Sequence, residues 1–327
     1  MRRWFYLCLG CLISAACLWL VLRRIDLTGV RPALMSIGLG TALAAMLIYL
    51  AGFIPRGLRW HLMLRDLGHY SLGETTRSVV LGYAVNNILP FRLGEVVRAA
   101  SFAKLNGTSR VTTLSSILAE RLLDLLSLIL IFSATLGGAG HFAGDPRLKP
   151  VLAGAGLLGG CGVAVLVMLG GPGRGLIVRL AATWPRFTTL TEKIFAAMTF
   201  FRSFRRLLMV ASLSLIIWLW EGLVFVVLAT ALHLPTPWLT GYFTLCVVNF
   251  SILIPSAPGF LGVFQAAAVL AAIILRHQES AGLALGILVH AAQFLPITLL
   301  GIALAWPLWT RLGGWRGMTS FSNDARH

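Results

Sequence analysis

The chain has 327 residues, of which 58% are hydrophobic and only 12% are charged, and its formal net charge is +16. Because soluble domains carry roughly 25% charged residues, this composition excludes an ordinary water-soluble domain and favours a protein that lies in a lipid bilayer. Long apolar runs exclude a transmembrane β-barrel, and basic residues placed between those runs argue against nucleic-acid binding, so we expect an all-α polytopic membrane protein.

Six apolar runs are near the length of about 20 residues that a membrane-spanning helix needs. We expect full spans at 4–22, 36–54, 111–136, 151–170, 207–232 and 281–310. Cys8 and Cys11 lie inside the first span, where helix packing is a better explanation than metal or redox chemistry. The sequence predicts one transmembrane domain over 1–310 and a short, disordered cytoplasmic tail over 311–327.

Two segments are too polar and too broken to be ordinary spans. The segment 78–104 holds Asn86, Asn87, Pro90, Arg92, Glu95 and Arg98, a set that no lipid-facing helix tolerates. The segment 240–276 is interrupted at Asn249, Pro255, Pro258 and Gly259. We expect both to be re-entrant hairpins of two half-helices, because irregular backbone at membrane depth must be surrounded by protein or water.

The two expected hairpins share a short motif. Residues 90–94 read Pro-Phe-Arg-Leu-Gly and residues 258–262 read Pro-Gly-Phe-Leu-Gly, so both fit the pattern P-x-x-L-G. Three expected spans separate the hairpins, which should therefore enter from opposite faces of the membrane. This arrangement is typical of the inverted repeats of transporters, and we predict such a repeat here.

Basic residues set the expected orientation, since cytoplasmic loops are rich in Lys and Arg. The segment 171–206 holds Arg174, Arg179, Arg186, Lys193, Arg202, Arg205 and Arg206 and is expected to be cytoplasmic, with an amphipathic stretch near 190–206 on the membrane surface. Counting spans from there places both termini in the cytoplasm of a plasma (inner) membrane protein. Only 23–35 fits poorly, because it is expected outside but is basic.

The two breaks predict a binding site near the middle of the membrane. Pro90 and Pro258 each precede a half-helix whose first N–H groups are expected to be unpaired and to point inward, and two such helix ends favour an anion. Arg92 adds a charge and a fork suited to phosphate. We predict a site for a phosphate-bearing lipid headgroup; the alternative is that Pro and Gly merely bend the chain.

The carboxylates near this site leave alternatives open. Glu95 either caps its half-helix or pairs with Arg92 or Arg98, or it takes part in proton coupling or binds an amine headgroup. Glu120 and Asp124 share one helix face. They form a structural ion-pair network, relay protons or hold a cationic headgroup, because charges at this depth must be paired or hydrated.

Other polar residues lie within or beside the spans. Glu221 is expected to pair with Arg92 or Arg121, which points about 100° away from Glu120 on its helix. Arg56 and Arg59 follow the second span, and snorkelling to lipid phosphate explains them.

The sequence contains no catalytic, cofactor or metal motif that we can defend. P-loop, G-x-S-x-G and H-E-x-x-H patterns are absent. His290 and Gln293 face one side of the last span, where a lone buried histidine is more often hydrogen-bonded structure than a ligand. We therefore expect no catalytic residue, no cofactor, no metal and no ATP-driven pump in this chain.

Four motifs occur in order along the chain. They are Arg56-x-x-Arg59-Trp60, Asn87-x-x-Pro90-x-Arg92-x-Gly94-Glu95-x-x-Arg98, Glu120-Arg121-x-x-Asp124 and Pro255-x-x-Pro258-Gly259-x-x-Gly262-Val263-Phe264. Over roughly residues 5–310 they resemble the lysylphosphatidylglycerol synthase transmembrane family, also called flippase-like. The family often has P-G-G-x-G at 258–262, and commonly has Glu where this chain has Gln265, which argues against a mechanism that needs an acid in the second hairpin.

The resemblance implies lipid translocation, or support of a separate synthase or glycosyltransferase. In the synthases that name the family, an aminoacyl-transferase domain follows this region, and this chain is expected to lack it. The expected partners are a phospholipid or lipid-linked substrate, anionic membrane lipids and, for an accessory role, a separate lipid-modifying enzyme; the oligomeric state is left open. The expected substrate-binding residues are Asn86, Asn87, Pro90, Arg92, Glu95, Arg98, Glu120, Arg121, Asp124, Glu221, Asn249, Pro255, Pro258, Gly259 and Gln265.

Three hypotheses follow. The first is a passive or ion-coupled flippase with a polar path between the hairpins. The second is an accessory subunit that presents a lipid to another enzyme. The third, and weakest, is a lipid-modifying enzyme that uses Glu120 and Asp124.

Overall fold

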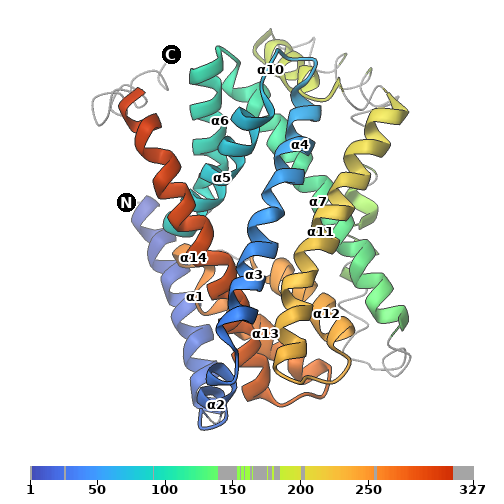
Figure 1. The fold of residues 1–327 in the computed structure, drawn as a ribbon. Helices are drawn as coiled ribbons and strands as arrows, with labels where there is room; N and C mark the ends of the chain where they lie inside the picture. Colours follow the sequence, from blue (N-terminus) through green and yellow to red (C-terminus); the bar gives the residue numbers. More distant parts are fainter. Residues whose placement is uncertain are drawn as a thin grey trace.

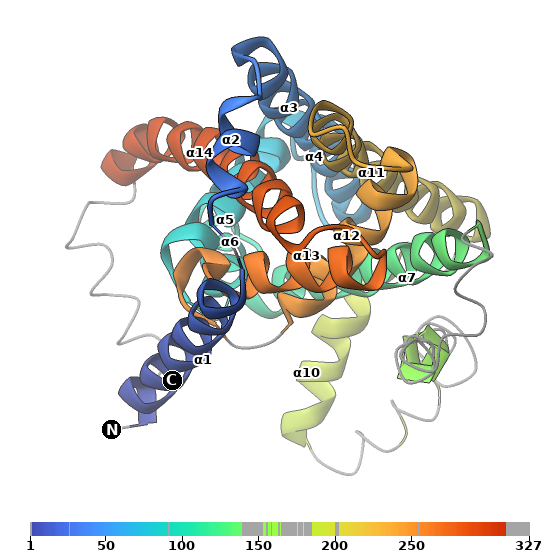
Figure 2. The ribbon, with the colours of Figure 1, turned by 90° about the horizontal axis from the view of Figure 1, so that it is seen from below.

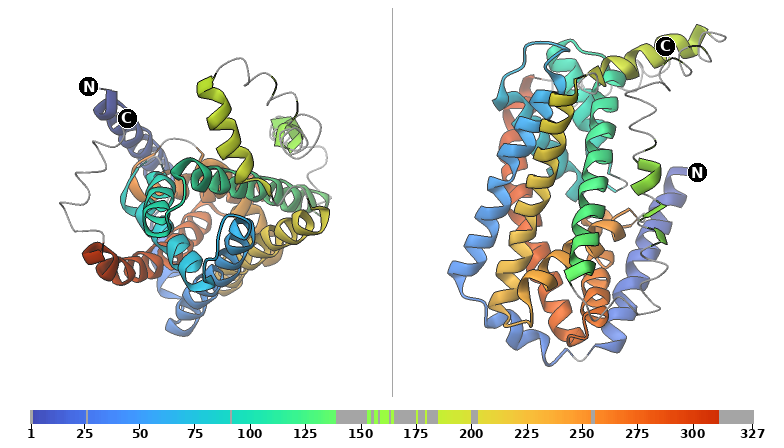
Figure 3. Two further views of the ribbon diagram at one scale, coloured as in Figure 1. Left: turned by 90° about the horizontal axis from the view of Figure 1, so that it is seen from above. Right: turned by 90° about the vertical axis from the view of Figure 1, so that its right-hand side faces the viewer.

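A computed structural model describes residues 2–138 apart from 26 and 91, residues 185–199, residues 203–311 apart from 254 and 255, and scattered positions between 153 and 179. The described residues form helices and no strand. The helices pack side by side into an elongated bundle (Figures 1 and 3). The expected all-α fold is confirmed.

Long helices form the frame of the bundle. They are α1 (Arg2–Arg24), α3 (Leu39–Ala51) continued by α4 (Phe53–Leu64), α7 (Arg110–Gly138), α11 (Phe204–Ala231) and α14 (Glu279–Arg311), with a short α2 (Val30–Met35) after the first. By length and composition, Leu39–Leu64, Phe204–Ala231 and Glu279–Ala305 suffice to cross a membrane. Helix α7 is also long enough, but it carries charged residues at its centre. The expected span at 151–170 lies mostly outside the described residues.

Both polar segments are helical hairpins, as predicted. The first consists of α5 (Leu72–Ile88) and α6 (Leu93–Asn106), and the second of α12 (Pro237–Ser251), a 3-10 turn (Pro258–Phe260) and α13 (Val263–Ile274). In two perpendicular views, α5 and α6 occupy one end of the bundle, and α12 and α13 the other (Figures 1 and 3). Helix α5 contacts the 3-10 turn, so the two hairpins meet tip to tip inside the bundle.

The breaks have matching backbone causes. Pro90 disfavours helix at the preceding Leu89, which is extended with φ −102° and ψ 141°. Arg92 and Phe260 then adopt the left-handed conformation, with φ of 53° and 58°. Both occupy the third position of P-x-x-L-G, where a non-glycine residue in this region is uncommon and costs about 1–3 kcal/mol. The two motifs thus share a left-handed third residue. They differ after it, because Leu93 and Gly94 already belong to α6, whereas Leu261 is extended and Gly262, with φ 84°, precedes α13.

The N–H group of the last glycine of each motif donates to an amide side chain. The N–H of Gly94 donates to Asn86 Oδ1 at 2.8 Å, and the N–H of Gly262 donates to Gln265 Oε1 at 2.8 Å. A Cβ on Gly94 would lie 2.1 Å from the carbonyl oxygen of Gly82, and one on Gly262 would lie 2.4 Å from that of Ser14. Each hairpin thus packs its second half-helix closely against a neighbouring backbone, which extends the likeness beyond the short motif and supports the predicted repeat.

Gly94→Ala should destabilise the protein, because backbone atoms must move to admit the new methyl group. We expect a loss of about 1–3 kcal/mol, measured as a lower unfolding temperature of the purified protein in detergent. Gly40→Ala is the control, since a Cβ there meets nothing within 4 Å and alanine favours helix. Equal unfolding temperatures for the two variants would contradict the close α5–α6 packing.

The second span extends further than predicted. Helix α4 follows α3 after Gly52, whose φ and ψ of −62° and −13° remain close to helical, and it ends at Leu64. Arg56 and Arg59 consequently lie inside the bundle, 1% and 0% exposed. The expectation that they snorkel to lipid phosphate is wrong, because carboxylates of other helices hold them in the interior.

Helix α10 (Pro185–Ala196) contacts α7 at the end of the bundle where α5 and α6 lie, and it projects away from the bundle (Figures 2 and 3). The amphipathic stretch expected near 190–206 is therefore shorter than predicted at its C-terminal end, where α11 begins at Phe204. Arg206 pairs with Asp66 at 2.5 Å, which ties the start of α11 to the end of α4. Which end of the bundle is cytoplasmic stays a prediction, as does the tail beyond Arg311.

Candidate functional site: a polar cavity between the hairpin tips

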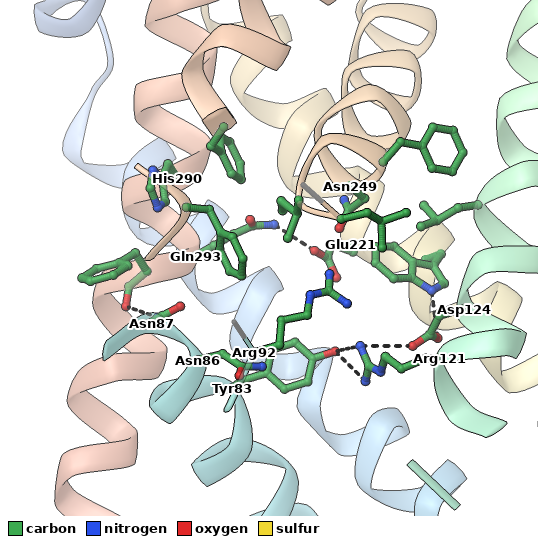
Figure 4. A pocket seen from close by; sticks show the side chains of 18 of the residues that line it. Tyr83, Asn86, Asn87, Arg92, Arg121, Asp124, Glu221, Asn249, His290 and Gln293 are labelled. Carbon is green, nitrogen blue, oxygen red and sulfur yellow. Dashed lines mark hydrogen bonds and ion pairs between the residues drawn. The ribbon is translucent and has the colours of Figure 1, made fainter. Parts of the chain in front are cut away.

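A polar cavity of about 140 Å³ lies where the hairpin tips meet. This volume far exceeds what a single water needs. Its walls come from both hairpins and from α3, α7, α11 and α14 (Figure 4). The polar side chains that line it are Tyr49, Tyr83, Asn86, Asn87, Arg92, Glu95, Arg121, Asp124, Trp218, Glu221, Asn249, His290 and Gln293.

The cavity brings together about half of the residues predicted from the sequence. Asn86, Asn87, Arg92, Glu95, Arg121, Asp124, Glu221 and Asn249 line it. Pro90, Arg98, Glu120, Pro258, Gly259 and Gln265 do not. Pro255 lies outside the described residues. The prolines and glycines shape the two breaks, whereas Arg98 and Glu120 lie behind the cavity wall.

The N–H groups at the start of α6 are already paired. Those of Leu93 and Glu95 donate to the carbonyl oxygens of Pro90 and Arg92, at 3.3 and 3.0 Å, and that of Gly94 donates to Asn86 Oδ1. The prediction that unpaired N–H groups at this helix start bind the anion is therefore wrong. At this hairpin tip, any attraction for an anion comes chiefly from side chains.

Arg92 is one of two arginines exposed to the cavity. Its side chain extends toward the centre of the cavity (Figure 4) and is 31% exposed. Its nearest carboxylate oxygen is Glu95 Oε1, at 3.9 Å, which is too long for a hydrogen bond. Arg92 is thus held in place by its backbone while its guanidinium stays weakly paired.

Arg121 is the second arginine exposed to the cavity, and 21% of its side chain is exposed. It pairs closely with Glu120 and more loosely with Asp124 Oδ2 at 3.5 Å and Glu95 Oε1 at 3.6 Å. It also lies 3.4 Å from the Tyr83 hydroxyl. Its buried Nε makes no hydrogen bond to the described residues, and the nearest carboxylate oxygen, Glu95 Oε1, lies 3.6 Å from it.

Buried arginines hold the carboxylates behind the cavity. Arg59 pairs with Asp124, with Glu120 Oε1 at 3.1 Å and with the Ser214 hydroxyl at 2.8 Å. Trp218 Nε1 donates to Asp124 Oδ1 at 2.9 Å. Three helices, α4, α7 and α11, are thereby joined around Asp124, so this carboxylate has a structural role.

Glu120 is engaged from several sides. Arg98 approaches both of its oxygens, at 3.3 and 3.0 Å, which is the bidentate geometry of a strong pair. The Arg98 guanidinium also lies 3.9 Å from the centre of the Trp60 ring, a favourable cation–π distance. The pair is 2% and 1% exposed, which supports the structural alternative for Glu120.

Glu221 has a different partner from the one predicted. It pairs with Arg56 of α4, rather than with Arg92 or Arg121. Arg56 also donates to the Gly52 carbonyl at 3.0 Å, and Gln293 Nε2 donates to Glu221 Oε1 at 3.0 Å. The arginine predicted to lie at the membrane edge is therefore the one that neutralises the mid-span carboxylate.

The charges in and behind the cavity leave one positive charge over. Five arginines (Arg56, Arg59, Arg92, Arg98 and Arg121) face four carboxylates (Glu95, Glu120, Asp124 and Glu221), so 5 − 4 gives +1. The buried pairs are close, whereas Arg92 and Arg121 are exposed and loosely paired toward the cavity. Buried charge is costly unless neutralised, so the cavity favours a monoanionic group.

The wall of the cavity near α5, α13 and α14 is held by hydrogen bonds between neutral side chains. Asn87 Nδ2 donates to Thr298 Oγ1 at 2.8 Å and fastens α5 to α14. His290 Nδ1 lies 2.9 Å from Gln265 Nε2, and its ring stacks on Phe264 at 4.6 Å. The prediction that His290 is hydrogen-bonded structure is confirmed, although it also lines the cavity.

Comparison with known proteins gives the family. Residues 7–301 match the family model described as Lysylphosphatidylglycerol synthase TM region. The chain belongs to this family. A curated relative, Glycosyltransferase AglD of Haloferax volcanii, is 26% identical over 324 residues, which cover 87% of this chain and 51% of that protein. The chain therefore spans about half the length of the curated relative that it matches, and no solved structure matches it.

Membership of the lysylphosphatidylglycerol synthase transmembrane family relates the chain to lipid-handling membrane proteins. Three polar or aromatic residues that line the cavity, Tyr49, Tyr83 and Trp218, were not predicted from the sequence. Tyr83 lies one helical turn before Asn86 and Asn87, so its position on the same helix face was a usable signal. Trp218 lies three residues before Glu221 on α11 and had the same kind of signal. Tyr49 had no such signal, because only packing turns it inward.

Proposed function

We propose that the protein translocates a lipid whose headgroup contains a phosphodiester, and that this headgroup passes through the polar cavity. The observation that carries the proposal is the unbalanced positive charge at the tips of two opposed hairpins. A phosphodiester carries one negative charge, which matches the charge left over at Arg92 and Arg121. Guanidinium forks also suit phosphate oxygens geometrically.

The two arginines are suited to different roles. Arg121 is tied to Glu120 and Asp124 and is backed by the buried pairs, so it provides a fixed anchor. Arg92 has one loose contact at 3.9 Å and can follow a headgroup over a short distance. A site that binds firmly on one side and loosely on the other favours passage over permanent retention.

A second candidate function is an accessory one, in which the protein presents a lipid to a separate enzyme. The relative named a glycosyltransferase is about twice as long as the stretch matched here, so a domain of this kind occurs there within a larger enzyme. We propose no catalytic role for Glu120, because it is 1% exposed and surrounded by arginines.

Purified protein in liposomes that carry fluorescent phosphatidylglycerol separates these functions. A translocating protein should make the inner-leaflet label accessible to an external quencher much faster than protein-free liposomes do. The assay should be run with and without a proton gradient, because Glu95 leaves ion coupling open. Lipid binding without any translocation under either condition would favour the accessory function and contradict the first.

A further inference from the structure

A second hollow adjoins the polar cavity on its α13–α14 side. It has a volume of about 250 Å³ and nearly all of its surface is apolar. Its outer wall is formed by Leu261, Ile287, Ala291 and Leu295. Leu261 and Leu295 are 55% and 48% exposed, so this apolar groove opens on the side of the bundle, where a bilayer protein meets hydrocarbon.

Two side chains line both hollows. His290 and Phe294 border the polar cavity as well as the apolar groove. Their rings lie edge to face, 5.7 Å apart, and His290 is fixed by its stack on Phe264 and its hydrogen bond to Gln265. A single layer of side chains therefore separates the polar cavity from the apolar groove.

We propose that the apolar groove holds an aliphatic chain of the same lipid whose phosphodiester occupies the polar cavity. This inference rests on the proposed function and adds a second subsite to it. A lipid is amphipathic, so its two parts need two adjoining environments of opposite polarity. Here, a positively charged hollow and an apolar, laterally open one share a wall. The groove would keep the chain in an apolar setting while the headgroup is inside the bundle.

Filling the groove tests the inference. Leu295→Trp and Ala291→Trp place a large ring in the groove, and the exposed position of Leu295 makes the first substitution the safer one for folding. Leu299→Trp is the matched control, because Leu299 lies one turn further along α14, is 67% exposed and does not line the groove. The two probes are dioleoyl phosphatidylglycerol and water-soluble glycerophosphoglycerol, each titrated against the purified protein.

We expect Leu295→Trp and Ala291→Trp to weaken binding of the dioleoyl lipid by about tenfold, since several buried methylene groups lose their contacts. Binding of glycerophosphoglycerol should stay unchanged in both variants, and the Leu299→Trp protein should bind both probes normally. Such a split supports a tail subsite that is separate from the headgroup site.

Other outcomes overturn the inference in distinguishable ways. If the groove variants bind the dioleoyl lipid as well as the unmodified protein does, the groove holds no lipid chain and the proposed function stands. If the Leu295→Trp protein changes its oligomeric state and keeps its lipid affinity, the groove is a protein interface. If the unmodified protein binds neither probe, the proposed function fails first, and the tail subsite fails with it.

Discussion

Arg92→Asn should lower the rate of lipid translocation by reconstituted protein about 10- to 100-fold. A hydrogen bond to a charged group is worth about 1.5–3 kcal/mol, and each 1.36 kcal/mol corresponds to a factor of ten in rate. Asparagine is chosen because it tolerates the left-handed backbone of Arg92, whose φ is 53°. The substitution therefore removes the charge and spares the hairpin tip. The measurement is the initial rate of label accessibility in liposomes.

The matched control is Arg205→Asn. Arg205 is exposed at the start of α11, in the basic stretch, and does not line the cavity. The Arg205→Asn protein should translocate lipid at a rate within about twofold of that of the unmodified protein, because exposed charges are screened by salt. Equal losses in the two variants would indicate general attraction to anionic lipid and would contradict a specific role for Arg92.

Arg56→Met should destabilise the protein by about 3–5 kcal/mol, because it leaves Glu221 buried without a counter-charge. The side chains of Arg56 and Glu221 are 1% and 9% exposed, and methionine retains most of the packing volume. At roughly 2–4 °C per kcal/mol, the unfolding temperature in detergent should fall by about 6–20 °C. Arg65→Met, at the exposed end of α4, should change it by no more than a few degrees.

The double variant Arg56→Met/Glu221→Leu completes the test. Replacing a buried ion pair with apolar side chains of similar volume is often neutral or stabilising, so the double variant should regain most of the lost stability. A cycle of the two single variants and the double one isolates the coupling between the residues. If the losses of the single variants simply add, the two side chains do not interact and the described pairing is wrong.

The broken hairpins could be predicted because their signals are local. Pro90 and Pro258 cannot continue a helix, and the polar residues beside Pro90 cannot face lipid. The repeated P-x-x-L-G pattern also pointed to equivalent positions, and the structure shows a left-handed residue at the third position of both. Three of the predicted full spans also followed from apolar length, although the second extends further than predicted, and the span at 151–170 stays a prediction.

The ion pairs could not be predicted, since their members are far apart in the chain. Arg56 and Glu221 are 165 residues apart, and Arg59 and Asp124 are 65 residues apart. Glu221 was predicted to pair with Arg92 or Arg121, and only helix packing selects Arg56 instead. The pairing of the α6 N–H groups with Asn86 and the loop carbonyls also depends on how the hairpin folds back.

Composition and local patterning alone thus determined that the chain is a helical membrane protein with two interrupted segments. The reason is that whether a stretch forms a helix and enters the bilayer depends mainly on the residues of that stretch. Which charges neutralise one another, and which remain for a ligand, was decided only by the tertiary structure. The physical reason is that buried charge is balanced over the whole cluster. The surplus at Arg92 and Arg121 exists only because the other arginines are closely paired.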